Sequence, residues 1–331
     1  MDRGRLVSVI VPYFNAQGSL ERTLHSLLEQ THRELEVVLV DDCSTDESRT
    51  ITARMIPLLE ARDVKVNLIR HEKNQGVAVA RNSGLDAASG EFIYFLDADD
   101  FIQPEAIGLM VEEARQKEAD IVGCHWYLTF GQNQRKMKQP AFANREEAIE
   151  KMLSGLMRWN LWLFLVRKSL YDQHGIRFVP GMNMGEDLLV TIKLFLVAGN
   201  VSAVDRHLYH YGQSNEASLT KVYSESHRRE VSANVLEVER CLASSWFAGK
   251  VGDYINFLKL SIKLPLLISN DPASYRAWLE WFPEANDQVM RNRAQPFRTR
   301  LLQQMAVKRQ FWFIKIYNKW VIGFVYGILF R

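Results

Sequence analysis

The chain has 331 residues, of which 47% are hydrophobic and 24% charged, and its formal net charge is +2. This composition excludes a disordered chain, and the length can bury one large hydrophobic core or two modest ones. We therefore expect two domains. A net charge close to zero provides no overall field to attract nucleic acid, so we expect no nucleic-acid partner.

The cysteine pattern and the N-terminal residues indicate in which cellular compartment the protein is expected. Cys43, Cys124 and Cys241 are widely spaced, odd in number and without a C-x-x-C pair. This usage is typical of a reducing compartment rather than of a disulfide framework. The first residues run into a short apolar strand instead of a signal-peptide core with a small-residue cleavage site, so we expect a protein that is not exported.

The first half of the chain alternates between strand and helix patterns. Predicted strands are Leu6–Val11, Leu35–Val40, Val64–Ile69, Phe92–Leu96 and Ile121–Cys124. Amphipathic spacing between them predicts helices over 18–28, Ser48–Ala61, Gly76–Ala88 and Pro104–Lys117. Nearly continuous apolar strands separated by helices predict an α/β fold, with a mainly parallel, Rossmann-like central sheet and helices on both faces.

Polar segments follow four of the predicted strands, and ligands of parallel sheets bind at the carboxyl ends of strands. These segments are Pro12–Asn15, Asp41–Asp46, His71–Gly76 and Asp97–Asp100. In the second, we expect Asp46 to cap a helix and Asp42 to accept from a base or sugar hydroxyl. In the fourth, Asp97 and Asp99 could face one hard cation such as Mg²⁺ or Mn²⁺. The alternative is an acidic N-terminal cluster for the following helix.

Seven short segments in a fixed order resemble the family 2 glycosyltransferases. They are residues 8–15, 27–31, 40–46, 74–76, 80–84, 95–100 and 185–187, and the resemblance covers about residues 6 to 215. Each block is a weak signal alone, whereas seven in order are specific. The resemblance implies a GT-A fold, a sugar-nucleotide donor, a Mn²⁺ or Mg²⁺ cofactor, inversion at the anomeric carbon and a place in bacterial cell-surface polysaccharide synthesis.

The resemblance also implies roles for individual residues in donor binding. The implied donor-nucleotide positions are Pro12, Phe14, Asn15, Asp42, Asn74, Arg81, Asp97 and Ala98. Asp42 would accept from the uracil imide, and Asp99 would be the direct metal ligand, with Asp97 contacting the ribose or a metal-bound water. Arg81 could offer a cation to the diphosphate or base, and its alternative is a solvated or salt-bridged helix arginine.

An inverting transfer requires a base that takes the proton of the acceptor hydroxyl. By the family pattern this base is Asp187, with Glu186 orienting the acceptor. Both precede the apolar run Leu188–Ala198, so they would lie in the first turn of a helix. The alternative, an acid that stabilises a helix N-terminus, is compatible with catalysis.

Other candidates are weaker. His210, in the strand-like segment Arg206–Tyr211, could approach the metal or diphosphate, although a structural histidine is the alternative. Gly212 follows the tyrosines where the family often has an arginine, and Cys43 stands where glycine is common. Candidates for an acceptor wall, whose alternative is core packing, are Trp126, Tyr127, Trp159, Trp162 and the loop Val179–Met184.

The last third predicts helices at Ser224–Leu242, Tyr254–Ile268 and Ala273–Trp281. We therefore expect a catalytic domain over 1–215, a helical domain over 216–304 and a basic, aromatic helix over 305–331. Residues 285–331 hold nine basic residues and one acidic residue. Lys308, Lys315 and Lys319 would share one face of a helix that is too charged to span a bilayer. It would lie on an anionic membrane, or alternatively pack on protein.

The sequence thus predicts a metal-dependent, inverting hexosyl- or N-acetylhexosaminyltransferase that uses a UDP-sugar. The acceptor would be a hydroxyl of a glycan or lipid-linked saccharide, and the enzyme would be cytoplasmic and peripheral on the inner face of the membrane. Gln295–Thr299 lacks the tryptophan of the processive Q-x-x-R-W motif, so we expect a non-processive enzyme. The alternatives are a non-catalytic sugar-nucleotide or membrane-binding module and a sugar nucleotidyltransferase, whose glycine-rich loop is absent.

Overall fold

The computed structural model describes residues 6–131, 133–213, 224–269 and 271–322. Its contacts divide the chain into two compact units. One comprises Met1–Glu146 with Trp159–Cys241, and the other comprises Glu147–Arg158 with Leu242–Arg331. These boundaries differ from the predicted ones at 215 and 304, and the predicted division into catalytic, helical and terminal segments stays a prediction.

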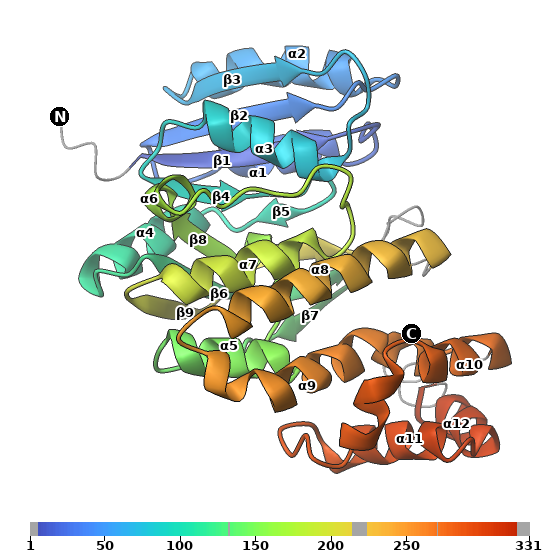
Figure 1. The fold of residues 1–331 in the computed structure, drawn as a ribbon. Coiled ribbons are helices and arrows are strands. Elements are labelled where there is room, and N and C mark those ends of the chain that lie inside the picture. Colours follow the sequence, from blue (N-terminus) through green and yellow to red (C-terminus); the bar gives the residue numbers. More distant parts are fainter. Residues whose placement is uncertain (1–5, 132, 214–223, 270, 323–331) are drawn as a thin grey trace. The chain divides into compact units, whose positions relative to one another are not determined.

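The first unit is built on a nine-stranded sheet in the order β3-β2-β1-β4-β8-β6-β9-β5, with β7 paired to β6. The strands are β1 (Val7–Tyr13), β2 (Leu35–Asp41), β3 (Lys65–Arg70), β4 (Phe92–Phe95), β5 (Phe101–Ile102), β6 (Ile121–Phe130), β7 (Asn133–Met137), β8 (Phe164–Arg167) and β9 (Val201–Gly212). Helices cover both faces of this sheet (Figure 1), so the predicted α/β fold class is confirmed.

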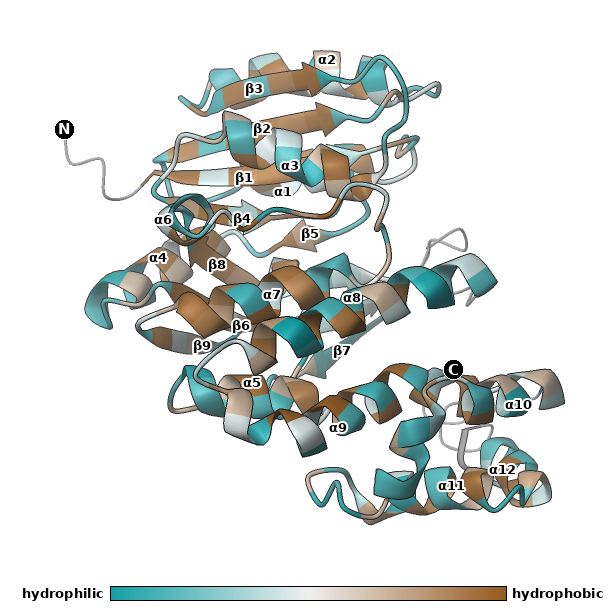
Figure 2. Cartoon of the chain, in the orientation of Figure 1, coloured by the Kyte–Doolittle hydropathy of each residue, from teal (hydrophilic) through white to brown (hydrophobic). Residues whose placement is uncertain are grey.

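The four N-terminal strands follow the prediction closely. β1 pairs in parallel with β2 and β4, and β2 with β3. The crossovers place α1 (Leu20–Leu28) and α2 (Ser48–Glu60) on one face and α3 (Val77–Ala87) on the other (Figure 1). β1 and β2 are buried along their whole length and strongly apolar (Figure 2). Their carboxyl ends therefore meet at one edge of the sheet.

The other half of the sheet is mixed rather than parallel. β8 is antiparallel to both β4 and β6, and β5 is antiparallel to β9, whereas β6 and β9 are parallel. The sequence pattern did not predict β5, β7 or β8, which have two, five and four residues. This half carries α4 (Ala106–Gln116), α6 (Lys168–Gln173), α7 (Glu186–Val197) and α8 (Glu225–Ala243).

The second unit contains most of α5 (Arg145–Leu153), together with α9 (Val251–Lys263), α10 (Pro272–Glu280), α11 (Phe297–Val307) and α12 (Phe311–Tyr317). The side chain of Lys263 is fully buried there and donates to the carbonyl oxygens of Trp281 and Phe282, at 2.8 and 3.1 Å. Among the described residues, no helix combines the length and the apolar character needed to cross a bilayer.

The terminal segment is not one helix over its described part. Arg309 has a left-handed backbone (φ 56°), so α11 ends at Val307 and α12 begins at Phe311. Lys308 therefore does not lie on the helix that carries Lys315, which corrects the predicted common face. Residues 323–331 of the predicted helix lie outside the described residues.

Candidate active site

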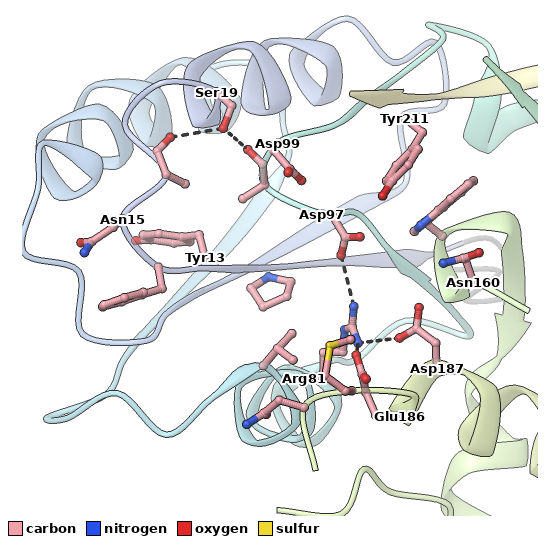
Figure 3. Close-up of a pocket in the computed structure, with 18 of the residues that line it drawn as sticks. Tyr13, Asn15, Ser19, Arg81, Asp97, Asp99, Asn160, Glu186, Asp187 and Tyr211 are labelled. Atoms are coloured by element: carbon pink, nitrogen blue, oxygen red, sulfur yellow. Dashed lines mark hydrogen bonds and ion pairs between the residues drawn. The ribbon is translucent and has the colours of Figure 1, made fainter. Parts of the chain in front are cut away.

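A cleft of about 620 Å³ opens at the carboxyl ends of β1 and β4, opposite the first turn of α7 (Figure 3). Nine of the predicted residues line it: Pro12, Phe14, Asn15, Arg81, Asp97, Ala98, Asp99, Glu186 and Asp187. Segments from both halves of the first unit therefore meet in one cavity. Asp42, Asn74 and His210 are not among its lining residues.

The acidic loop after β4, Asp97–Asp100, is held in place by hydrogen bonds from residues at the start of α1. The Ser19 hydroxyl donates to the carbonyl oxygen of Ala98 at 2.9 Å, and the Thr23 hydroxyl lies 2.9 Å from the same oxygen and 2.7 Å from that of Asp100. Arg22 donates to the carbonyl oxygen of Asp99 at 2.8 Å. These contacts use backbone atoms, so they fix the loop without occupying the carboxylates of the two aspartates in the cleft.

Asp100 belongs to the structure of the sheet rather than to the cleft. Its carboxylate accepts from the Tyr209 hydroxyl at 2.5 Å and from the backbone N–H of Gly212 at 2.6 Å. Burial raises the pKa of Asp100 well above its ordinary value. A Cβ at Gly212 would lie 2.9 Å from the carbonyl oxygen of Asp99, so this close approach requires glycine where the family often has arginine.

Three carboxylates converge on the buried guanidinium of Arg81 (Figure 3). One terminal nitrogen donates to Glu186 and to Asp187, each at 2.6 Å, and the other donates to Asp97 at 3.2 Å. The side chain of Arg81 is only 5% exposed. Removing one partner of a buried ion pair typically costs about 3–5 kcal/mol. The salt-bridged arginine that the sequence left as an alternative is thus present in this structure.

The cleft carries an excess of negative charge. Asp97, Asp99, Glu186 and Asp187 face it, whereas Arg81 is the cation among its lining residues in the described chain. Burial, together with the neighbouring carboxylate of Asp187, raises the pKa of Glu186. Burial likewise raises the pKa of Asp97, although Arg81 acts in the opposite direction. A bound cation would relieve this repulsion.

Asp187 lies at the start of α7, as predicted. One carboxylate oxygen accepts from Arg81, and the other accepts from the backbone N–H of Leu161 at 3.4 Å. Gly185, which precedes the helix, has a left-handed backbone (φ 78°) that favours glycine and turns the chain sharply into α7. The first-turn position also places the carboxylate at the positive end of the helix dipole.

The loop after β1 carries the residues that are predicted to bind the nucleoside of the donor. The Phe14 side chain is 47% exposed and lines the cleft. Asn15 has a left-handed backbone (φ 49°) and accepts from the backbone N–H of Thr45 at 2.8 Å, which ties this loop to the segment after β2. Asp46 accepts from the N–H of Ser48 at 3.0 Å, at the start of α2, but the N-cap position itself is occupied by Glu47 rather than by Asp46.

Asp42 is buried beneath this loop. Its carboxylate accepts from the backbone N–H groups of Gln75 and Gly76, at 2.9 and 2.8 Å, and contacts His71 at 2.7 Å. In this structure it therefore holds the segment before α3, and the predicted contact with uracil stays a prediction. Asn74 is exposed in the same segment.

Cys43 has a left-handed backbone, with φ at 68°. This explains the glycine that is common at its position, because left-handed backbone favours glycine. The thiol lies 3.4 Å from the carbonyl oxygen of Glu72, so Cys43 also contacts the segment before α3.

The structure does not bring His210 to the acidic cluster. Its ring stacks between Phe101 and Tyr127, with centroid distances of 4.1 and 4.5 Å. Its nitrogens lie 2.6 Å from the side-chain amide of Gln103 and 3.3 Å from the Thr129 hydroxyl. These are the contacts of a structural histidine, and burial lowers its pKa to about 4.

The depressed pKa of His210 predicts acid sensitivity. Because the folded state favours the neutral ring, stability is full above the unfolded-state pKa of 6.5 and falls as the pH drops from about 6.5 to 4. The loss should reach about 2–3 kcal/mol. Urea unfolding between pH 7.5 and 4.5 measures it, and His210→Gln should flatten the slope. An equal slope in both proteins would contradict the prediction.

Several lining residues were not singled out in the sequence: Tyr13, Ala16, Gly18, Ser19, Val77, Asn160, Gly185 and Tyr211. Of the candidates for an acceptor wall, Trp159, Trp162 and the loop residues Asn183 and Met184 line the cleft, whereas Trp126 and Tyr127 do not. The ring of Trp162 stacks on that of Tyr209, with a centroid distance of 4.2 Å, and Trp162 is only 4% exposed. It is therefore part of the hydrophobic core as well as of the wall of the cleft. Tyr211 lies in the strand-like segment Arg206–Tyr211, and its place near the tyrosine motif of the family is the signal that could have indicated it.

Comparisons with known proteins give a consistent result. The model of "Glycosyl transferase family 2" matches residues 8–186. The uncharacterized glycosyltransferase EpsJ of Bacillus subtilis is 30% identical over 277 residues, which is 81% of this chain and 79% of EpsJ. A crystal structure of S. aureus TarS 1-349 in complex with UDP-GlcNAc has a TM-score of 0.67 at 20% identity, covering 98% of this chain and 93% of that one.

A mannosyltransferase, PcManGT from Pyrobaculum calidifontis, in complex with GDP-Man and Mn²⁺, is more distant. Its TM-score is 0.54 at 17% identity, covering 95% of this chain and 87% of that one. At these identities the solved structures show the GT-A fold alone. The family match covers the loop after β1 and the acidic loop and ends at Glu186, the first residue of α7. The chain therefore belongs to glycosyl transferase family 2, and it is a glycosyltransferase.

Proposed function

We propose that the protein is a metal-dependent, inverting and non-processive glycosyltransferase. It would move a hexosyl or N-acetylhexosaminyl group from a UDP-sugar to a hydroxyl of a glycan or lipid-linked saccharide in cell-surface polysaccharide synthesis. The observation that carries the proposal is the cleft in which Asp97 and Asp99 face Asp187 and Glu186. Asp187 is the proposed base, and Glu186 would orient the acceptor. The TarS complex with UDP-GlcNAc supports the choice of nucleotide.

The donor set is suited to Mg²⁺ or Mn²⁺. No group of three or more His, Cys, Asp or Glu side chains forms a metal site in the described ranges. Such ions are usually held by one or two carboxylates, with water and substrate phosphates completing the shell. Asp99 and Asp97 would supply those carboxylates, and the negative charge of the cleft favours a cation. When bound, the ion would offset charge on the departing diphosphate.

The test is UDP release from a panel of UDP-sugars with Mn²⁺, using GDP-mannose as the competing donor. We expect release with at least one UDP-sugar and little with GDP-mannose. Release only with GDP-mannose would contradict the UDP assignment. No release and no nucleotide binding in the whole panel would instead favour a non-catalytic module.

We also propose that the terminal segment contacts an anionic membrane surface on the cytoplasmic side. Trp312, Ile316 and Trp320 are spaced by four residues and are 60%, 50% and 66% exposed. Lys315 and Lys319 lie beside them and are exposed as well. Exposed aromatic side chains flanked by lysines are typical of helices that bind in a bilayer interface.

Replacing both tryptophans should weaken membrane binding. The double variant Trp312→Ser, Trp320→Ser should bind vesicles with anionic lipid about tenfold less tightly or worse, because it loses the apolar part of the contact. Sedimentation with vesicles measures this, and higher salt should weaken the wild type. Trp246→Ser, which removes another exposed tryptophan of the second unit, is the matched control. Equal binding by all three proteins would contradict the proposal.

A further inference from the structure

Arg81 occupies a position that a plain nucleotide contact does not require. It lies in α3, and its three acidic partners come from two other segments: Asp97 after β4, and Glu186 and Asp187 at the start of α7. One guanidinium therefore joins the loop proposed to carry the metal with the turn proposed to carry the base. No other ion pair of the described residues joins these two segments.

The local packing fixes this guanidinium in place. At Gly84, one turn further along α3, an added Cβ would lie 2.3 Å from the Ile10 side chain, so the helix contacts β1 closely at this point. The guanidinium carbon of Arg81 lies 5.9 Å from the ring centre of Phe95 and 5.5 Å from that of Phe178. Aromatic rings at these distances attract the cation and limit its movement.

The hydrogen bonds of Arg81 are directed to the acids rather than to open space. Both acids of α7 accept from one terminal nitrogen, and Asp97 accepts from the other. The Nε–H group is buried and has no hydrogen-bond partner in the described structure. A carboxylate that acts as a base must point at the acceptor hydroxyl within hydrogen-bond distance. Arg81 holds one oxygen of Asp187, and the backbone N–H of Leu161 lies 3.4 Å from the other, so the orientation of this carboxylate is fixed from both sides.

We propose that Arg81 is a positioning residue, which orients the Asp187 carboxylate relative to the acidic loop and does not itself bind the nucleotide. This rests on the proposed function, because it takes Asp187 as the base. It replaces the donor contact expected for Arg81 from the family resemblance. Its role then lies in the turnover step, and donor affinity is set elsewhere in the cleft.

The test compares Arg81→Gln with wild type in the UDP-sugar reaction that the panel identifies. We expect kcat to fall about 10²-fold, because a general base that is wrongly oriented contributes much less to the rate of transfer. KM for the donor, and the Kd of UDP with Mn²⁺, should change less than threefold. Arg81→Lys, which keeps one charge but not the fork, should recover part of kcat. The matched control is Arg167→Gln, which removes an arginine paired with Glu91 and Asp120 at the opposite edge of the sheet.

A double variant separates positioning from a direct contact. If Arg81 acts through the base, Arg81→Gln should lower kcat little further in an Asp187→Asn background. A tenfold weaker Kd for UDP in Arg81→Gln with kcat unchanged would overturn the proposal, as would additive losses in kcat. If Arg81→Gln does not fold, Arg81→Lys carries the same comparison. Activity of wild type with none in Asp187→Asn supports the base separately, so failure of the two proposals can be distinguished.

Discussion

Asp187→Asn should lower the rate of sugar transfer by about 10³-fold or more, because the amide cannot take the proton of the acceptor hydroxyl. The substitution keeps the size of the side chain, and the amide oxygen can still accept from Arg81. Donor binding should therefore persist, with a Kd for UDP within about threefold of wild type. The measurements are kcat from UDP release in the presence of acceptor and UDP binding by calorimetry.

The control for this experiment is Asp86→Asn, which removes an exposed carboxylate of α3 that pairs with Arg177. It changes the same chemical group outside the cleft and should leave kcat unchanged. Near-normal turnover in Asp187→Asn would refute the base assignment. Loss of both turnover and UDP binding would point instead to a structural role at the start of α7.

Asp99→Ala should remove metal-dependent donor binding. If Asp99 is the direct ligand, the variant should bind UDP with Mn²⁺ no better than wild type binds UDP in the presence of EDTA. Turnover should fall about 10²-fold or more, since one of the few protein ligands of the ion is lost. Titration of UDP with and without Mn²⁺ measures the metal dependence directly, and transfer assays measure the turnover.

The neighbouring acid provides a contrast to this result. Asp100 is buried and bonded to Tyr209, so Asp100→Asn should lower stability, while the Mn²⁺ dependence of UDP binding remains. If Asp99→Ala retains the full stimulation of UDP binding by Mn²⁺, then Asp99 is not the ligand. If wild type itself shows no stimulation by Mn²⁺ or Mg²⁺, the proposed metal dependence is wrong.

The N-terminal half was predictable because each element carries its own signal. β1 to β4 are short apolar runs, and α1 to α3 have amphipathic spacing, so local patterns suffice. β5 and β8 were not predictable, because their antiparallel partners lie far away in the chain. β5, for example, has only two residues and exists through pairing with β9.

The site was predictable in its residue types but not in its internal pairing. Family motifs indicated Asp97, Asp99, Glu186 and Asp187, and the structure places all four around one cleft. Nothing in the sequence indicated that Arg81 joins three of them, because the partners are 16, 105 and 106 residues away. The stacked environment of His210 was equally invisible, since it depends on strands that the patterns missed.

The long separation between Arg81 and its partners in α7 has a consequence for folding during synthesis. The strands β1, β2, β3 and β4 are complete by Phe95, whereas Asp187 emerges about ninety residues later. At synthesis rates of about 5–20 residues per second, the buried cation lacks two of its counter-charges for several seconds. We therefore expect the early half to remain loosely packed on the ribosome, and the cleft to close as a late, non-local step.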